Sequence, residues 1–149
     1  MIEIKKLGIE HFEPIVAFDK LCFPTDFWKE EDFKELLSDE RTTYYAAMDG
    51  DIIAADVFIY NWQGKQDYVK IMNVAVHPDY RKRGLAKQLL NLVTEEMLQL
   101  GMKRFCGETR ASNFAMQHTF ESCGYKHERT VENCYENPTE SAFKYVLQL

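Results

Sequence analysis

The sequence predicts an α/β protein with a mixed, mostly antiparallel central sheet of about seven strands and flanking helices. Three observations support this prediction. Seven short segments have the pattern of strands, four others place apolar residues at helical spacing, and a strand-helix-strand run lies in the middle of the chain. The 149 residues are 46% hydrophobic and 28% charged, which predicts a single domain over residues 1–149 with one buried core.

The first part of the chain is expected to form one strand and two helices. Ile2–Lys5 is a short strand, and His11–Cys22 carries apolar residues at helical spacing. The next helix begins near Phe27–Lys29 and ends at Ser38-Asp39. The aromatic turn Phe23–Trp28 either forms the wall of a substrate site or packs in the core.

Three strands then form an antiparallel meander. They are predicted over Thr42–Met48, Ile52–Tyr60 and Tyr68–Val76. Asp49-Gly50 is a strong signal for a two-residue hairpin turn, and Asn61–Lys65 forms a looser turn that contains Gly64.

A long helix connects this meander to the next strand. Its apolar stripe consists of Leu85, Ala86, Leu89, Leu90, Val93, Met97 and Leu100. Gly101 ends the helix, and Arg104–Thr109 is a strand that should run parallel to Tyr68–Val76.

The last part of the chain is expected to form one helix and two strands. Ser112 can cap a helix that runs from about Asn113 to Cys123. The strands Tyr125–Tyr135 and Ala142–Leu147 follow, and Glu136-Asn137-Pro138 forms the turn between them.

Composition excludes several classes of protein. The formal net charge of -6 argues against a nucleic-acid partner, and the apolar runs are too short to cross a membrane. Residues 1–7 are charged where a signal peptide would be apolar, so a cytoplasmic protein is expected, either a monomer or a homodimer. The four cysteines lack C-x-x-C spacing and should be reduced and mostly buried. The four histidines are scattered, and no metal is predicted.

The junction between a strand and the long helix has unusual chemistry. Arg81, Lys82 and Arg83 precede the helix, although the positive end of a helix dipole disfavours cations. Free backbone N–H groups, neighbouring cations and Gly84 together suit a phosphate. The chain has no G-x-x-x-x-G-K-[ST] motif and no G-x-G-x-x-G run, so neither a P-loop nor a dinucleotide site is supported.

Arg81-x-x-Gly84-x-Ala86, placed behind Val-Ala-Val-His-Pro at residues 74–78, resembles the acetyl-CoA-binding motif of the GNAT N-acetyltransferase superfamily. The resemblance implies a GNAT fold in which the strand-helix-strand unit is the acetyl-CoA-binding core. It also implies an acetyl-CoA-dependent N-acetyltransferase.

Two later segments extend the resemblance. Glu108–Asn113 and Phe120–Tyr125 are similar, at matching spacing, to segments of the bacterial ribosomal-protein-alanine N-acetyltransferase branch. The likeness is good over residues 71–135 and thin before residue 42.

The resemblance implies roles for particular residues. Strand backbone groups would bind the pantetheine arm, amides from Lys82 to Lys87 would hold the pyrophosphate, and Asn113 would bond the arm near its reactive end. Asn113 has an alternative role as an ordinary residue of the helix start. The implied cofactor-binding residues are Val74, Ala75, Val76, Arg81, Lys82, Arg83, Gly84, Leu85, Ala86, Lys87 and Asn113.

The family chemistry is direct attack of an amine on the acetyl thioester in a ternary complex. Glu108 matches the general base of the branch. Phe120 stands where the branch has a tyrosine acid, so the proton donor for the thiolate is open between Tyr135, Tyr125, water, and a thiolate that needs little help. Tyr135 is the favoured donor by its loose family match, and the predicted catalytic residues are Glu108 and Tyr135. The alternative roles are an ordinary sheet or surface carboxylate for Glu108 and a strand-end aromatic for Tyr135.

Three functions remain in competition. The acceptor is the amine of a peptide or protein N-terminus, or it is a small-molecule amine such as a polyamine or amino sugar. Alternatively, the chain is a catalytically weak acyl-CoA-binding sensor, because Phe120 cannot donate a proton.

Overall fold

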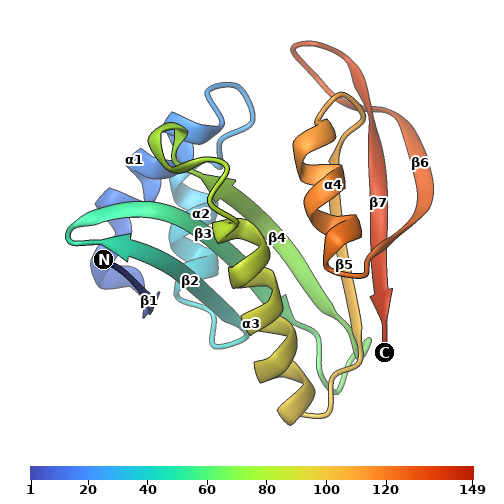
Figure 1. Cartoon of the computed structure of the whole chain (residues 1–149), viewed down its shortest axis with the longest axis horizontal. Coiled ribbons are helices and arrows are strands. Elements are labelled where there is room, and N and C mark those ends of the chain that lie inside the picture. The colour runs from blue at the N-terminus through green and yellow to red at the C-terminus, as the bar shows by residue number, and fades with distance from the viewer. The chain divides into compact units, whose positions relative to one another are not determined.

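The computed structural model describes residues 1–149 and contains one seven-stranded sheet in the order β1-β2-β3-β4-β5-β7-β6, with four α-helices (Figure 1). The predicted mixed, mostly antiparallel sheet with flanking helices is confirmed. The strands are β1 Ile2–Leu7, β2 Thr42–Asp49, β3 Ile52–Asn61, β4 Val69–Val76, β5 Arg104–Arg110, β6 Lys126–Tyr135 and β7 Glu140–Gln148. The helices are α1 Phe12–Cys22, α2 Glu30–Leu37, α3 Leu85–Gln99 and α4 Phe114–Ser122, with short 3-10 helices η1 Ile9–His11 and η2 Pro78–Tyr80.

The chain forms two compact units. Unit 1 consists of residues 1–60 and 72–89, and unit 2 consists of residues 61–71 and 90–149. Strand β4 and helix α3 each contribute residues to both units. The organisation as a single domain stays a prediction.

Unit 1 contains the hairpin between β2 and β3. Asp49 pairs with Ile52, so the two turn residues are Gly50 and Asp51, one position later than predicted. Gly50 has φ 60, which suits the first central position of a type II′ turn.

The core of unit 1 lies between its strands and the helices α1 and α2 (Figure 1). The Phe33 ring packs at 5.3 Å from the Phe58 ring, and Tyr44 lies 5.8 Å from the same ring. Phe23 and Trp28 pack against this cluster. Of the two roles open for the aromatic turn, the structure supports core packing for these two residues.

Unit 2 is built on β5, β7 and β6, which are antiparallel neighbours. Val69 and Lys70 of β4 pair with β5 in parallel, which confirms the predicted parallel pair. Strand β7 lies between β5 and β6, so residues of β5 and β7 become direct cross-strand neighbours.

Three details differ from the sequence-based expectations. Leu100 is exposed, because α3 ends at Gln99 and Gly101 turns the chain with φ 87. All four cysteines are free, but none is fully buried, and Cys134 is exposed on β6. Asn113 rather than Ser112 caps α4, because the Asn113 side chain accepts a hydrogen bond from the Met116 N–H.

Candidate active site

The loop before α3 presents backbone N–H groups at the start of the helix. The Gln88 N–H donates to the Gly84 carbonyl at 3.0 Å, which makes it the first amide bonded along the helix. Leu85 and Ala86 precede Gln88 in the first turn of the helix, where the helix contains no carbonyl that could accept from their N–H groups. Both side chains are buried, so these two residues fix the start of α3 by their packing.

Two residues of this loop have positive φ. Lys82 has φ 64 and Gly84 has φ 72, and a residue with a Cβ rarely adopts this conformation. A Cβ built on Gly84 would meet no atom within 4 Å, so it would project into open space at the helix start. Gly84 therefore allows a ligand to approach the backbone closely.

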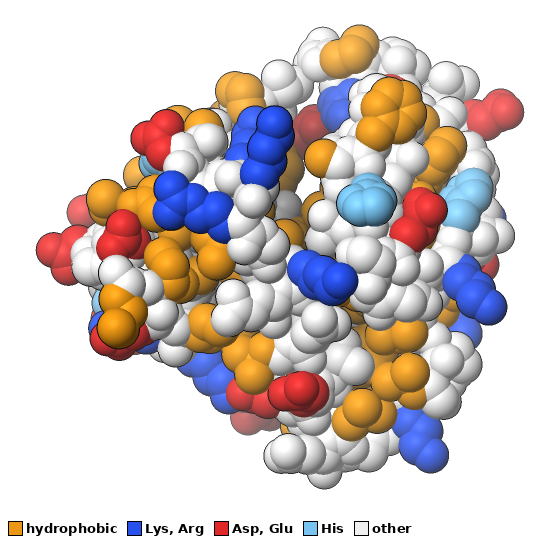
Figure 2. All heavy atoms as spheres, viewed as in Figure 1, with side chains coloured by type: hydrophobic (Ala, Val, Ile, Leu, Met, Phe, Trp, Pro, Cys, Tyr) orange, Lys and Arg blue, Asp and Glu red, His pale blue; other side chains and the backbone are white.

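The cations of the loop are exposed, and Figure 2 shows Lys and Arg side chains gathered over the segment before α3. The Arg83 guanidinium lies 4.9 Å from the centre of the Tyr80 ring and donates to the Asp79 carbonyl at 3.4 Å. The Tyr80 hydroxyl donates to Asp49 at 2.5 Å, which lowers the pKa of that carboxyl. Arg83 is thus held by its neighbours, while Arg81 and Lys82 extend from the same loop.

The end of β4 carries the predicted pantetheine-binding residues. Ala75 is buried, whereas Val74 and Val76 are only half-buried, so their side chains contribute less to the core than expected. The Cys22 thiol donates a hydrogen bond to the Val76 carbonyl, with 3.7 Å between sulfur and oxygen. The backbone N–H of the next residue, His77, donates to the Ala54 carbonyl at 2.8 Å.

Two buried carboxyl groups lie inside unit 1, and sequence reasoning missed both. Asp56 accepts a hydrogen bond from the Tyr44 hydroxyl, and burial raises the pKa of Asp56 to about 7. Asp19 accepts from the Trp28 N–H at 2.7 Å and from the Asn73 side chain at 2.8 Å, and burial also raises its pKa. An aspartate inside the apolar run of residues 52–60 was the available signal for Asp56.

Glu108 occupies the centre of a polar cluster in unit 2. The Tyr135 hydroxyl donates to its Oε2 at 3.2 Å, and the Lys144 Nζ donates to its Oε1 at 2.5 Å. The structure therefore brings the two predicted catalytic residues together. It adds Lys144, which sequence reasoning missed.

An irregular stretch of β6 places Tyr135 in this cluster. Val131 pairs with Ala142 and Tyr135 with Glu140, so three residues of β6 oppose one residue of β7. Asn133, within this stretch, has φ 53. Such bulges redirect side chains at the edge of a sheet.

Arg110 supports the Tyr135 ring. Its guanidinium lies 4.7 Å from the ring centre and donates to the carbonyls of Glu136 at 2.6 Å and Pro138 at 2.9 Å. Glu140 binds Arg110 at 3.1 Å and accepts from the Ser112 N–H at 2.6 Å. The hydrogen bonds from Ser112 and Arg110 help to hold the pKa of Glu140 below its ordinary value. These contacts fix the turn between β6 and β7 around the tyrosine.

Phe120 and Tyr125 are core residues of unit 2. Phe120 is 1% exposed, and its ring lies 5.0 Å from Tyr125 and 5.2 Å from Tyr145. A Cβ on Gly107 would lie 2.6 Å from the Phe120 ring, so the glycine makes room for it. Burial raises the pKa of Tyr125, and its hydroxyl has no hydrogen-bond partner. Of the two tyrosines considered as proton donors, Tyr135 is the half-buried one.

The remaining predicted residue, Asn113, begins α4 as an exposed N-cap. Its side-chain oxygen accepts from Met116, which uses the cap role that sequence reasoning left open. The amide nitrogen of the same side chain is a further donor that can bind a ligand carbonyl.

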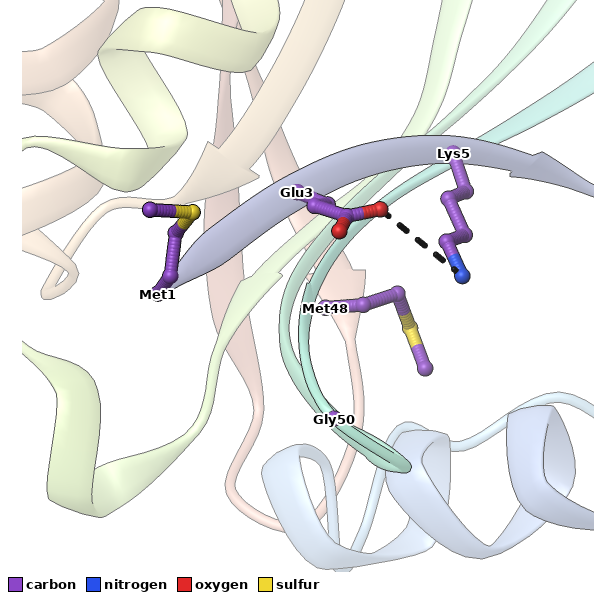
Figure 3. A pocket seen from close by; sticks show the side chains of 5 residues that line it. All are labelled: Met1, Glu3, Lys5, Met48 and Gly50. Carbon is purple, nitrogen blue, oxygen red and sulfur yellow. Dashed lines mark ion pairs between the residues drawn. The ribbon is translucent and has the colours of Figure 1, made fainter.

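A depression of about 220 Å³ is lined by Met1, Glu3, Lys5, Met48 and Gly50, and Glu3 and Lys5 form an ion pair at its rim (Figure 3). It contains none of the predicted site residues. No group of three or more His, Cys, Asp or Glu side chains could hold a metal ion. The longest helices are too short or too polar to span a membrane.

Comparisons with known proteins agree with the fold. The model of the acetyltransferase (GNAT) family matches residues 11–125. The [ribosomal protein bS18]-alanine N-acetyltransferase of Escherichia coli K12 is 28% identical over 113 residues, which cover 76% of this chain and 73% of that protein.

Solved structures give the same result. The crystal structure of the ribosomal-protein-S18-alanine N-acetyltransferase from Escherichia coli superposes with a TM-score of 0.88 at 25% identity, covering 99% of this chain and 94% of that chain. Arabidopsis thaliana NAA60 in complex with acetyl-CoA has a TM-score of 0.87 at 17% identity and covers 100% of this chain and 99% of its own, which shows similarity of fold alone.

Proposed function

The chain belongs to the acetyltransferase (GNAT) family and is an acetyl-CoA-dependent N-acetyltransferase, and we propose that its acceptor is the α-amino group of a peptide or protein N-terminus. The observation that carries the proposed amine chemistry is Glu108, a half-buried carboxylate that contacts Tyr135 and Lys144. An attacking amine must lose a proton, and such a carboxylate can accept it. The similarity to a ribosomal-protein-alanine N-acetyltransferase supports an N-terminal acceptor.

We further propose which residues hold acetyl-CoA. Backbone groups of Val74–Val76 would bond the pantetheine arm, and the amides of Lys82–Lys87 would hold the pyrophosphate beside Arg81 and Arg83. Asn113 would bond the arm through its amide nitrogen. The open space over Gly84 and the cationic loop support this assignment.

The proposed chemistry balances without a covalent enzyme intermediate. The amine nitrogen bonds to the acetyl carbon, its proton passes to Glu108 directly or through water, and the bond from the acetyl carbon to sulfur breaks. Tyr135 gives its proton to the departing thiolate and recovers one from Glu108, with which it shares a hydrogen bond of 3.2 Å. This path assigns no proton transfer to Phe120.

Glu108→Gln is expected to lower kcat by about 100-fold, because an amide cannot accept the proton of the amine. The affinity for acetyl-CoA, measured by calorimetry, should stay unchanged. Glu121→Gln, an exposed position on α4, is the control and should keep the wild-type rate. Wild-type kinetics in Glu108→Gln would reject the base role.

An acceptor screen tests the proposed function. Three sets of amines are compared by thiol release from acetyl-CoA: peptides with a free N-terminal alanine, the same peptides with a blocked N-terminus and an internal lysine, and small amines. We expect kcat/KM to be at least about tenfold higher for the free N-terminus. Faster small amines would establish the second candidate, whereas acetyl-CoA binding without turnover on any amine would establish the sensor.

We propose a cytoplasmic, single-domain enzyme that acts as a monomer or homodimer without a metal, a nucleic-acid partner or a membrane. Its net charge of -6 supports the exclusion of nucleic acid.

A further inference from the structure

Lys144 contacts Glu108 through a cross-strand pair. The two residues are direct partners in the antiparallel pairing of β5 and β7, so their side chains lie on the same face of the sheet. The Lys144 Nζ lies 2.5 Å from Oε1 of Glu108. The strand register itself therefore brings the ammonium to the carboxylate.

This pair is less exposed than an ordinary surface ion pair. The side chains of Lys144 and Glu108 are 25% and 31% exposed. A carboxylate that has lost most of its contact with water needs a compensating charge or hydrogen bonds. The remaining exposure leaves room for an amine to approach Glu108.

The two oxygens of Glu108 have separate partners. Lys144 contacts Oε1, and Tyr135 contacts Oε2. Rotation of the carboxylate would break both contacts at once, so the ammonium and the hydroxyl together fix its plane. A base held in a single orientation presents its lone pairs in a constant direction.

We infer that Lys144 is a positioning residue, which holds the Glu108 carboxylate oriented between its own ammonium and the Tyr135 hydroxyl for proton transfer. This inference rests on the proposed role of Glu108 as the base. It assigns Lys144 no contact with acetyl-CoA or with the acceptor. Its effect must pass entirely through the carboxylate of Glu108.

A double-mutant cycle tests this dependence, with kcat and the KM for acetyl-CoA measured for each variant. Lys144→Met is expected to lower kcat about tenfold with KM unchanged, as misorientation of a reacting group does. In the Glu108→Gln background the same substitution should change kcat by less than about twofold, because its target is gone. Lys144→Arg keeps the positive charge and should recover most of the rate.

Lys126→Met is the matched control, since Lys126 is an exposed lysine on β6 and the change in net charge is the same. It should leave kcat unchanged. An equal loss of rate from Lys144→Met in both backgrounds, or a Lys144→Arg variant as slow as Lys144→Met, would overturn the inference. If the wild-type protein turns over and Lys144→Met is equally active, the inference about Lys144 is overturned and the proposed function still holds. Absence of turnover in the wild-type chain would instead reject the proposed function.

Discussion

Gly84→Val is expected to lower the affinity for acetyl-CoA by about 1000-fold or more. The new side chain would project into the open space at the start of α3, where a Cβ meets no atom within 4 Å. It would therefore stand between the phosphates and the backbone amides, and each charge-assisted hydrogen bond lost to a phosphate costs about 1.5–3 kcal/mol. Calorimetry with acetyl-CoA measures the change directly.

The control for this variant must carry the same backbone strain. Gly84 has φ 72, and valine in that conformation destabilises any fold. Gly50 has φ 60 and open space around its Cβ position, but it lies in the hairpin between β2 and β3. Gly50→Val should lose comparable stability and bind acetyl-CoA normally. An equal loss of affinity in both variants would show that strain, rather than the blocked approach, is responsible.

The loop before α3 was predictable because its signals are local. Three cations, a proline and a glycine within a few residues describe a strand end, a turn and a helix start without reference to the rest of the chain. The positive φ of Lys82 was not predictable, since nothing in the residue type demands it.

The surroundings of Glu108 depend on long-range pairing. The sequence predicted that the last two strands pair with each other, but it did not indicate that β7, rather than β6, lies beside β5. That order places Lys144 opposite Glu108, and the irregular stretch of β6 brings Tyr135 within reach. Packing and register set both facts. Glu108 and Tyr135 could therefore be named from the family pattern, whereas Lys144 could not.

Asp56→Asn is expected to raise the free energy of unfolding above that of wild type at pH 8. Relative to the same comparison at pH 4, the gain should be about 2–4 kcal/mol. The aspartate is 1% exposed, and burial raises its pKa to about 7 although the Tyr44 hydroxyl donates to it. In the unfolded chain the same carboxyl titrates near its ordinary value of about 3.9.

The direction of the effect follows from proton binding. Below about pH 4 the carboxyl is protonated in the folded and the unfolded state, so its titration does not lower the free energy of unfolding. Between about pH 4 and pH 7 the unfolded state loses its proton first, so the wild-type free energy of unfolding falls as the pH rises. Asparagine cannot ionise, and its carbonyl can still accept the Tyr44 hydrogen bond. The variant therefore escapes this loss of stability.

Urea unfolding of both proteins at pH 4 and pH 8 measures the effect, and the comparison between the two pH values removes pH-independent costs. One such cost arises because the amide nitrogen of the variant would take the place of the Asp56 Oδ1 atom. This atom is buried and has no hydrogen-bond partner in the structure. Asp19 is present in both proteins, and its raised pKa lowers the stability of both as the pH rises. Asp51→Asn removes an exposed carboxyl from the hairpin turn and should leave the difference between pH 4 and pH 8 close to that of wild type. If Asp56→Asn and wild type lose the same free energy of unfolding between pH 4 and pH 8, then Asp56 is not a neutral acid held inside the core at low pH.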